Sequence, residues 1–211
     1  MFFLKLFINM SDNKLKALNI IALGNSNVGK TSFIVRYTEN YFRDFYLSTV
    51  GIDYKTKIIT LPNKNKYKVD FYDTAGQERY KSIAVNVIKN AEGIILMYDI
   101  TQQNTFESIS NWMENIFSQK GKDFPVVLIG NKCDLEERVV SKDEGEEMAK
   151  KYGLSFFESS NKTGENIEEA GMELINKIIE KKEKDKAFEN EDDNQVKLRI
   201  KKNNKKKKCC K

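Results

Sequence analysis

The sequence contains one stretch, Gly24-Asn25-Ser26-Asn27-Val28-Gly29-Lys30-Thr31-Ser32, that directly follows an apolar run at residues 18–23 (LNIIAL). Its spacing matches the pattern GxxxxGK[ST] in full. The two glycines allow the backbone to curl so that successive N–H groups face one anion, and a helix that begins here adds its dipole. In this pattern Lys30 neutralises the β- and γ-phosphates, and the Thr31 hydroxyl ligates Mg²⁺. We therefore predict a phosphate-binding loop between a strand and a helix.

Short apolar runs alternate with amphipathic segments around this loop. Buried strands are predicted at residues 18–23, 93–98, 124–129 and 154–157. Helices are predicted at residues 105–118, 141–151 and 166–181, the first two opened by N-capping residues. Stricter alternation on both sides of Pro62-Asn63-Lys64-Asn65 predicts an antiparallel hairpin of residues 55–61 and 66–72. The fold class is therefore α/β, with a six-stranded, mostly parallel sheet, one antiparallel edge strand and helices on both faces.

Composition excludes several classes of protein. The chain has 211 residues, 32% charged and 40% hydrophobic, which suits one domain with a polar appendage, and no stretch approaches the ~20 apolar residues of a membrane span. Histidine is absent, which excludes catalytic triads and most zinc enzymes. The three cysteines form no disulfide framework, so a reducing compartment is expected.

Charge separates the chain into two parts. Residues 194–211 carry nine basic residues and no acidic one, which leaves residues 1–193 at −4 once those nine are subtracted from the net +5. An acidic body with a basic tail argues against a nucleic-acid surface across the whole domain.

Residues 1–14 form an N-terminal lead in which Lys5 interrupts an apolar run. We expect translation to start at Met10 rather than a signal peptide, with an interfacial anchor as the alternative.

Three later segments narrow the choice among ATPase, kinase and GTPase. Asp73-Thr74-Ala75-Gly76-Gln77 follows the third strand; it offers a carboxylate near the metal, a glycine N–H for the γ-phosphate and a glutamine that orients water. Asn131-Lys132-Cys133-Asp134 offers a carboxylate for the paired N–H donors that guanine has and adenine lacks. Glu158-Ser159-Ser160-Asn161-Lys162 backs the base with main-chain N–H groups. All lie at the carboxyl ends of strands, where such sheets bind ligands.

With these motifs the sequence resembles the Ras superfamily of small GTPases, and within it the Rab family, over residues 15–182. The segments that look Rab-like are residues 49–54, 67–72, 80–83, 96–101 and 111–116. The resemblance implies that Thr49 completes the Mg²⁺ shell, that Asp73 acts on the ion through water and that Phe42 stacks on guanine. It also implies an effector surface of Tyr54, Tyr72 and Val87, which alternatively are ordinary packing residues. Asn161, Tyr72 and Val87 depart from the residues usual in the family.

The expected site residues fall into groups by role. The catalytic residues are Gln77 and Lys30. The residues that bind GTP or GDP are Asn25, Ser26, Asn27, Val28, Gly29, Lys30, Thr31, Ser32, Phe42, Thr49, Gly76, Asn131, Lys132, Asp134, Ser160, Asn161 and Lys162. The Mg²⁺ ligands, direct or through water, are Thr31, Thr49 and Asp73.

The last residues, Cys209-Cys210-Lys211, look like the two-cysteine ends on which Rabs carry two geranylgeranyl chains. Residues 183–208 are polar and predict a disordered tether with a basic run. The alternatives are an unmodified tail or a nuclear-type basic cluster. Lipid on Cys209 and Cys210 predicts a protein that cycles between the cytosol and the cytoplasmic face of a membrane.

The sequence therefore predicts a monomeric Rab-type GTPase that regulates vesicle transport and hydrolyses GTP slowly on its own. The expected partners are an exchange factor, a GTPase-activating protein, a lipid-shielding chaperone and effectors, with no nucleic acid. One alternative is a soluble nucleotide-dependent module whose basic tail binds RNA or DNA. A second is a metabolic P-loop kinase, which needs a lid with clustered arginines that we do not find in the sequence.

Overall fold

The computed structural model describes residues 15–42, 52–74 and 88–208, with side chains at 15–42, 53–73 and 88–188. One sheet has the strand order β2-β3-β1-β4-β5-β6. Its strands are β1 (Lys16–Leu23), β2 (Ile52–Thr60), β3 (Lys66–Thr74), β4 (Gly93–Asp99), β5 (Val126–Asn131) and β6 (Ser155–Ser159). β2 and β3 pair antiparallel, and the other neighbours pair parallel. The predicted sheet, including its antiparallel edge strand, is confirmed.

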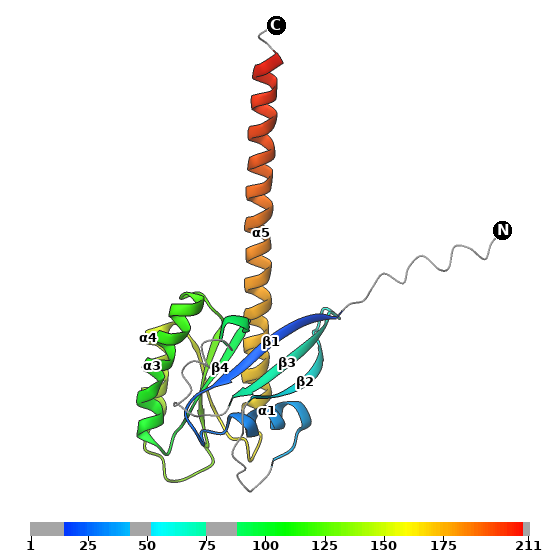
Figure 1. Cartoon of the computed structure of the whole chain (residues 1–211). Coiled ribbons are helices and arrows are strands. Elements are labelled where there is room, and N and C mark those ends of the chain that lie inside the picture. The colour runs from blue at the N-terminus through cyan, green and yellow to red at the C-terminus, as the bar shows by residue number, and fades with distance from the viewer. Residues whose placement is uncertain (1–14, 43–51, 75–87, 209–211) are drawn as a thin grey trace, which may run out of the picture.

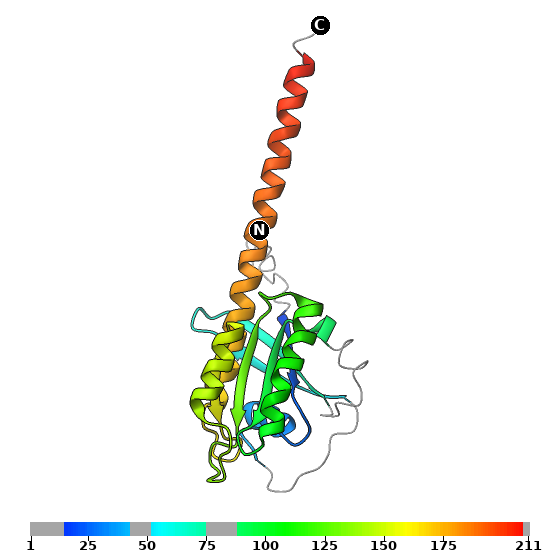
Figure 2. The same ribbon diagram turned by 90° about the vertical axis from the view of Figure 1, so that its left-hand side faces the viewer.

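Helices cover both faces of this sheet. They are α1 (Lys30–Glu39), α3 (Gln103–Lys120), α4 (Lys142–Tyr152) and α5 (Ile167–Lys208). In Figure 1, α3 and α4 lie on one side of the sheet, and α1 and the first part of α5 lie on the other. Figure 2 gives the turned view, with α3 and α4 in front of the strands. This is the arrangement that alternating strands and helices predict.

The central strands are buried on both faces, as expected for parallel strands between helical layers. Every residue of β4 and of β5 is buried. Alternate residues of β4 point to opposite sides, so that Ile94 and Leu96 join one apolar layer and Ile95 and Met97 join the other. These two layers fix the carboxyl ends of the strands, where the predicted site residues follow.

The C-terminal segment differs from the expectation. The sequence predicts a helix that ends near residue 181 and a disordered tether from residue 183, but α5 runs as one helix to Lys208 and extends well beyond the sheet (Figure 1). Residues 182–208 contain neither glycine nor proline to end a helix. Pairs at helical spacing continue into this segment, such as Lys181 with Asp185 at 3.9 Å. The predicted disorder is corrected accordingly. Among the described helices, none is long and apolar enough to cross a membrane.

Candidate functional site

The loop between β1 and α1 has a curled backbone. Gly24, Asn27 and Gly29 have φ angles of 138°, 63° and 103°. A Cβ at Gly24 would lie 2.2 Å from the Met97 carbonyl oxygen, and a Cβ at Gly29 would lie 2.3 Å from Nδ2 of Asn131. The left-handed backbone and the close neighbours both require glycine at these two positions. The motif glycines therefore serve the loop shape that an anion-binding cradle needs.

Lys30 places a positive charge inside this loop. Its side chain is buried, at 5% exposure. Its Nζ donates to the carbonyl oxygens of Gly24 at 3.0 Å and Asn25 at 2.7 Å. The ammonium group is therefore held by the backbone of its own loop, where it can neutralise a phosphate group.

Two oxygen ligands suited to a hard cation meet beside the loop. The Thr31 hydroxyl, on the first turn of α1, donates to Oδ2 of Asp73 at the end of β3 over 2.6 Å. Asp73 is buried, at 3% exposure. Hydroxyl and carboxylate oxygens of this kind suit Mg²⁺, which keeps several waters and takes few protein ligands. These residues therefore fit a magnesium ion next to the phosphate-binding loop.

Two asparagines join the loops that follow β5 and β6 to the phosphate-binding loop. Nδ2 of the buried Asn131 donates to the Val28 carbonyl at 2.7 Å, and Nδ2 of Asn161 donates to the Gly29 carbonyl at 3.0 Å. The Ser159 hydroxyl donates to Oδ1 of Asn131 at 3.2 Å. Three segments that are distant in sequence therefore meet at one edge of the sheet, as their positions after strands predict.

Lys132 and Asp134 frame the position expected for a base. Lys132 adopts a φ of 71°, and its Nζ pairs with Oδ2 of the fully buried Asp99 at 2.6 Å. Oδ1 of Asp99 accepts from the backbone N–H and the hydroxyl of Thr101 at 2.9 and 2.7 Å. Asp134 is exposed. A carboxylate open to solvent in this position can pair with a ligand that brings its own donors.

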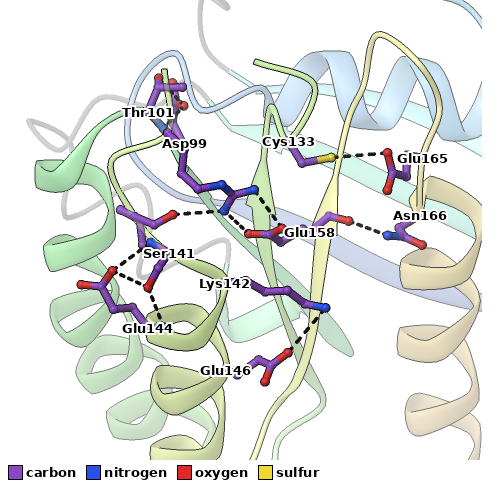
Figure 3. Close-up of polar contacts among 12 residues, drawn as sticks. Asp99, Thr101, Cys133, Ser141, Lys142, Glu144, Glu146, Glu158, Glu165 and Asn166 are labelled. Atoms are coloured by element: carbon purple, nitrogen blue, oxygen red, sulfur yellow. Dashed lines mark hydrogen bonds and ion pairs between the residues drawn. The ribbon is translucent and has the colours of Figure 1, made fainter. Parts of the chain in front are cut away.

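Side chains behind the base loops hold them in place (Figure 3). Both oxygens of Glu158 accept from the guanidinium of Arg138, and Nη2 of Arg138 lies 3.0 Å from Oε2. Nδ2 of Asn166 donates to the Glu158 carbonyl at 2.7 Å. Glu158 thus links the loop at 132–140 to the start of α5, which keeps the end of β6 fixed.

The same region contains Cys133, whose thiol lies 3.7 Å from Oε2 of Glu165 (Figure 3). Burial and, less strongly, the negative charge of Glu165 raise the pKa of Cys133 to about 11. The thiol therefore stays protonated and unreactive near neutral pH.

The remaining predicted residues occupy varied positions. In the phosphate-binding loop Ser26 and Asn27 are exposed, and Ser32 is half-buried on α1. Phe42 is half-buried, Lys162 is exposed, and the buried Ser160 accepts the Thr163 N–H through its hydroxyl at 3.1 Å.

Tyr54 and Tyr72 face each other across β2 and β3 with ring centroids 6.3 Å apart. Tyr54 is 64% exposed and Tyr72 half-buried, which suits either an interface or packing.

Six of the predicted residues lie outside the described residues: Thr49, Gly76, Gln77, Val87, Cys209 and Cys210.

Sequence reasoning missed three supporting residues. Asp99 neutralises Lys132, and the only hint in the sequence is a carboxylate at the end of an otherwise apolar run. Ser108 and Trp112 of α3 contact the side chain of Asn25. No local pattern links residues so far apart in the chain.

Comparisons with known proteins agree with this geometry. A model of the Ras family matches residues 19–180. Ras-related protein Rab-3 of Caenorhabditis elegans is 44% identical over 163 residues, which cover 77% of this chain and 74% of the relative. Rab-10 of Diplobatis ommata is 42% identical over 77% of this chain and 81% of the relative. Rab-8B of Homo sapiens is 42% identical over 77% and 78%. The match covers the sheet, the phosphate-binding loop and both base loops, and the chain therefore belongs to the Ras family as a Rab-type small GTPase, which binds guanine nucleotide and hydrolyses GTP.

Proposed function

We propose that this GTPase is a membrane-recruited switch for vesicle transport, with residues 24–32, 73–77, 131–134 and 158–162 as its nucleotide site. The proposal is supported most directly by the joining of four separate segments at one edge of the sheet through Thr31–Asp73, Asn131–Val28 and Asn161–Gly29. These are the segments that a Mg²⁺-bound guanine nucleotide requires together.

Each part of the site has its own task in this proposal. The backbone of the phosphate-binding loop and Lys30 hold the phosphates, while Thr31, Thr49 and, through water, Asp73 would hold Mg²⁺. The bound ion supplies charge neutralisation between the β- and γ-phosphates. Asp134 accepts the N–H donors of guanine, with Phe42 stacked on the ring. Gln77 orients the attacking water.

The switch itself follows from contacts to the γ-phosphate. Thr49 and Gly76 are held by the γ-phosphate and its metal and released after hydrolysis. The ordered state presents the surface of Tyr54, Tyr72 and Val87 to effectors. Intrinsic hydrolysis in such enzymes is slow, near ~10⁻⁴ s⁻¹, which implies a GTPase-activating protein and an exchange factor.

Catalysis is tested by two substitutions with different expected effects. Gln77→Leu should retain nucleotide and Mg²⁺ and slow single-turnover hydrolysis at least ~10-fold, because water loses its orienting group. Thr31→Asn should weaken the binding of Mg²⁺ and leave the protein mainly in its GDP-bound state. Hydrolysis by Gln77→Leu at the parent rate, with and without an activating protein, would remove Gln77 from this role.

Membrane recruitment is tested separately at the C-terminus. Two prenyl chains on Cys209 and Cys210, helped by up to ~1 kcal/mol for each basic residue near an anionic leaflet, should give a stable anchor. Replacement of both cysteines by serine should release the protein to the cytosol without a change in GTP binding. Neutralising Lys205 to Lys208 should only weaken recruitment. Free thiols on the membrane-bound protein would contradict lipidation, and salt-sensitive RNA or DNA binding would favour the alternative of a nucleic-acid module.

A further inference from the structure

The side chain of Asn25 leaves the phosphate-binding loop and contacts α3. Its Oδ1 accepts the indole N–H of Trp112 at 3.1 Å, and its Nδ2 donates to the hydroxyl oxygen of Ser108 at 2.9 Å. Ser108 and Trp112 are four residues apart, so they lie on the same face of the helix. One amide therefore bridges residues that are 83 and 87 positions away in sequence.

Both ends of this amide have a fixed orientation. An indole N–H can only donate, so Oδ1 rather than Nδ2 must face Trp112. The Ser108 hydroxyl donates its proton to the Asn104 carbonyl at 2.7 Å, so its oxygen can only accept from Nδ2 of Asn25. The Asn25 side chain thus has one hydrogen-bonding arrangement that satisfies both partners.

The helix that holds Asn25 is itself fixed. Ile109, Met113 and Ile116 of α3 are fully buried in the apolar layer that α3 shares with β4. Trp112 packs partly against the same layer. The partners of Asn25 therefore belong to the rigid part of the domain rather than to a loop.

The backbone of Asn25 connects this anchor to the charged group of the site. Its carbonyl oxygen accepts the shorter of the two hydrogen bonds from Lys30 Nζ to the loop, at 2.7 Å. A displacement of Asn25 would therefore move the carbonyl that holds the ammonium group. We propose that Trp112 and Ser108 are positioning residues, which hold Asn25 against α3 and so fix the phosphate-binding loop and Lys30 for the nucleotide. This inference rests on the proposed role of that loop in binding guanine nucleotide.

Trp112 also provides a built-in reporter, because it is the one tryptophan of the chain. Its fluorescence emission responds to the hydrogen bond that its indole N–H donates, and the acceptor, Asn25, belongs to the phosphate-binding loop. Release of GDP by chelation of Mg²⁺ should therefore change the tryptophan emission of the parent protein. Asn25→Ala should abolish that change while Trp112 remains in place.

The decisive experiment measures the dissociation of a fluorescent GDP analogue from the full-length protein. Trp112→Phe keeps an aromatic ring against the apolar layer and removes the N–H donor together with part of the indole ring. We expect Trp112→Phe to release nucleotide about 3- to 10-fold faster, the effect of one lost hydrogen bond. Asn25→Ala also loses the bond to Ser108, so its release should be at least as fast. The double variant should be no faster than the faster single variant, because both substitutions break the same contact. Ser108→Ala should have a smaller effect in the same direction.

The matched control is Asn115→Ala on the same helix. Asn115 is exposed, and among the described residues its side chain bonds only to the Asn111 carbonyl within α3. It should keep the parent release rate, and melting temperatures of the GDP-bound proteins should show that all variants are folded. A parent rate in Trp112→Phe, or effects that multiply in the double variant, would overturn the inference. Failure of the parent protein to bind the analogue, or retention of its affinity when Lys30 is replaced by alanine, would instead count against the proposed site.

Discussion

The phosphate-binding loop at residues 24–32 takes its shape from its backbone, whereas the base loops at 131–134 and 158–162 are held by contacts between side chains. Positive φ angles at Gly24, Asn27 and Gly29 curl the first loop. Ion pairs such as Lys132–Asp99 and Arg138–Glu158 hold the base loops. The main-chain N–H groups of the first loop can bind the phosphates of any nucleotide. The Asp134 side chain, backed by main-chain N–H groups of residues 158–162, can distinguish one base from another. Affinity and specificity are therefore separable by mutation.

The largest effect is expected on the phosphate side, from Gly29→Ala. The new Cβ would meet Nδ2 of Asn131 at 2.3 Å and Nδ2 of Asn161 at 2.6 Å, on a backbone with a φ of 103°. Strain and displaced neighbours together should lower GDP affinity by about 4 kcal/mol, or ~1000-fold, in a titration experiment. Gly153→Ala is the matched control, because φ is 69° there but no atom of the described residues lies within 4 Å of the added Cβ. It should cost folding stability alone, and an equal loss of GDP affinity in both variants would contradict this explanation.

A smaller effect with a different signature is expected on the base side, from Asp134→Asn. The amide cannot accept both N–H donors of guanine, but it can donate to the extra carbonyl of xanthine. GTP affinity should fall by ~3 kcal/mol, about 100-fold, while binding of xanthosine triphosphate improves. Asp123→Asn, at an exposed position before β5, should change neither. Unchanged GTP binding in Asp134→Asn would remove this residue from the base site.

The ion pair that supports the base loops should affect the stability of the fold rather than the specificity for the base. Arg138→Met leaves the half-buried Glu158 without its two-pronged partner and should lower the free energy of unfolding by about 1–2 kcal/mol in urea, with GDP kept saturating. Arg138→Lys should recover part of this loss. Lys142→Met breaks an exposed pair with Glu146 at 3.7 Å and should cost under ~0.5 kcal/mol. Equal losses of unfolding free energy in Arg138→Met and Lys142→Met would show that the two-pronged contact between Arg138 and Glu158 adds no more stability than an exposed ion pair.

The smallest effect concerns the thiol of Cys133. Its pKa of about 11 means that the thiolate is scarce below that pH, so alkylation should be slow at pH 8 and rise toward pH 11. Glu165→Gln removes a negative charge that opposes ionisation, so it should lower the pKa and speed alkylation a few-fold. The rate is measured with Cys209 and Cys210 replaced by serine. Glu169→Gln, an exposed position on α5, serves as the control, and equal rates in the two variants would exclude Glu165 as a cause.

The fold could be predicted from the sequence because its signals are local. Apolar runs and the alternation of the hairpin predicted every strand to within three residues at each end, and Ser141 caps α4 as expected. Its reciprocal capping box with Glu144 was not predicted. The N-cap expected at Thr105, the first residue of the predicted helix, was wrong. α3 begins at Gln103 without a side-chain cap, because the Thr105 hydroxyl bonds instead to the carbonyls of Asp99 and Gln102.

Contacts within the site were less predictable. The motifs predicted which loops meet, but not that Asn161, expected to act through its backbone, also bonds to Gly29 through its side chain. The pairs Asp99–Lys132 and Asn25–Trp112 depend on how distant segments pack, which no local pattern contains. Sequence signals therefore define the loops of the site, while the side chains that hold them are visible only in the folded chain.

The most direct test of this division between affinity and specificity is to titrate the parent protein with GDP, IDP and ADP in the presence of Mg²⁺. The three ligands share their phosphates and differ only in the base. GDP should bind tightest, IDP about 10- to 100-fold more weakly because it lacks one donor to Asp134, and ADP at least ~10⁴-fold more weakly. Equal affinity for GDP and ADP would contradict the assignment of base recognition to residues 131–134 and 158–162.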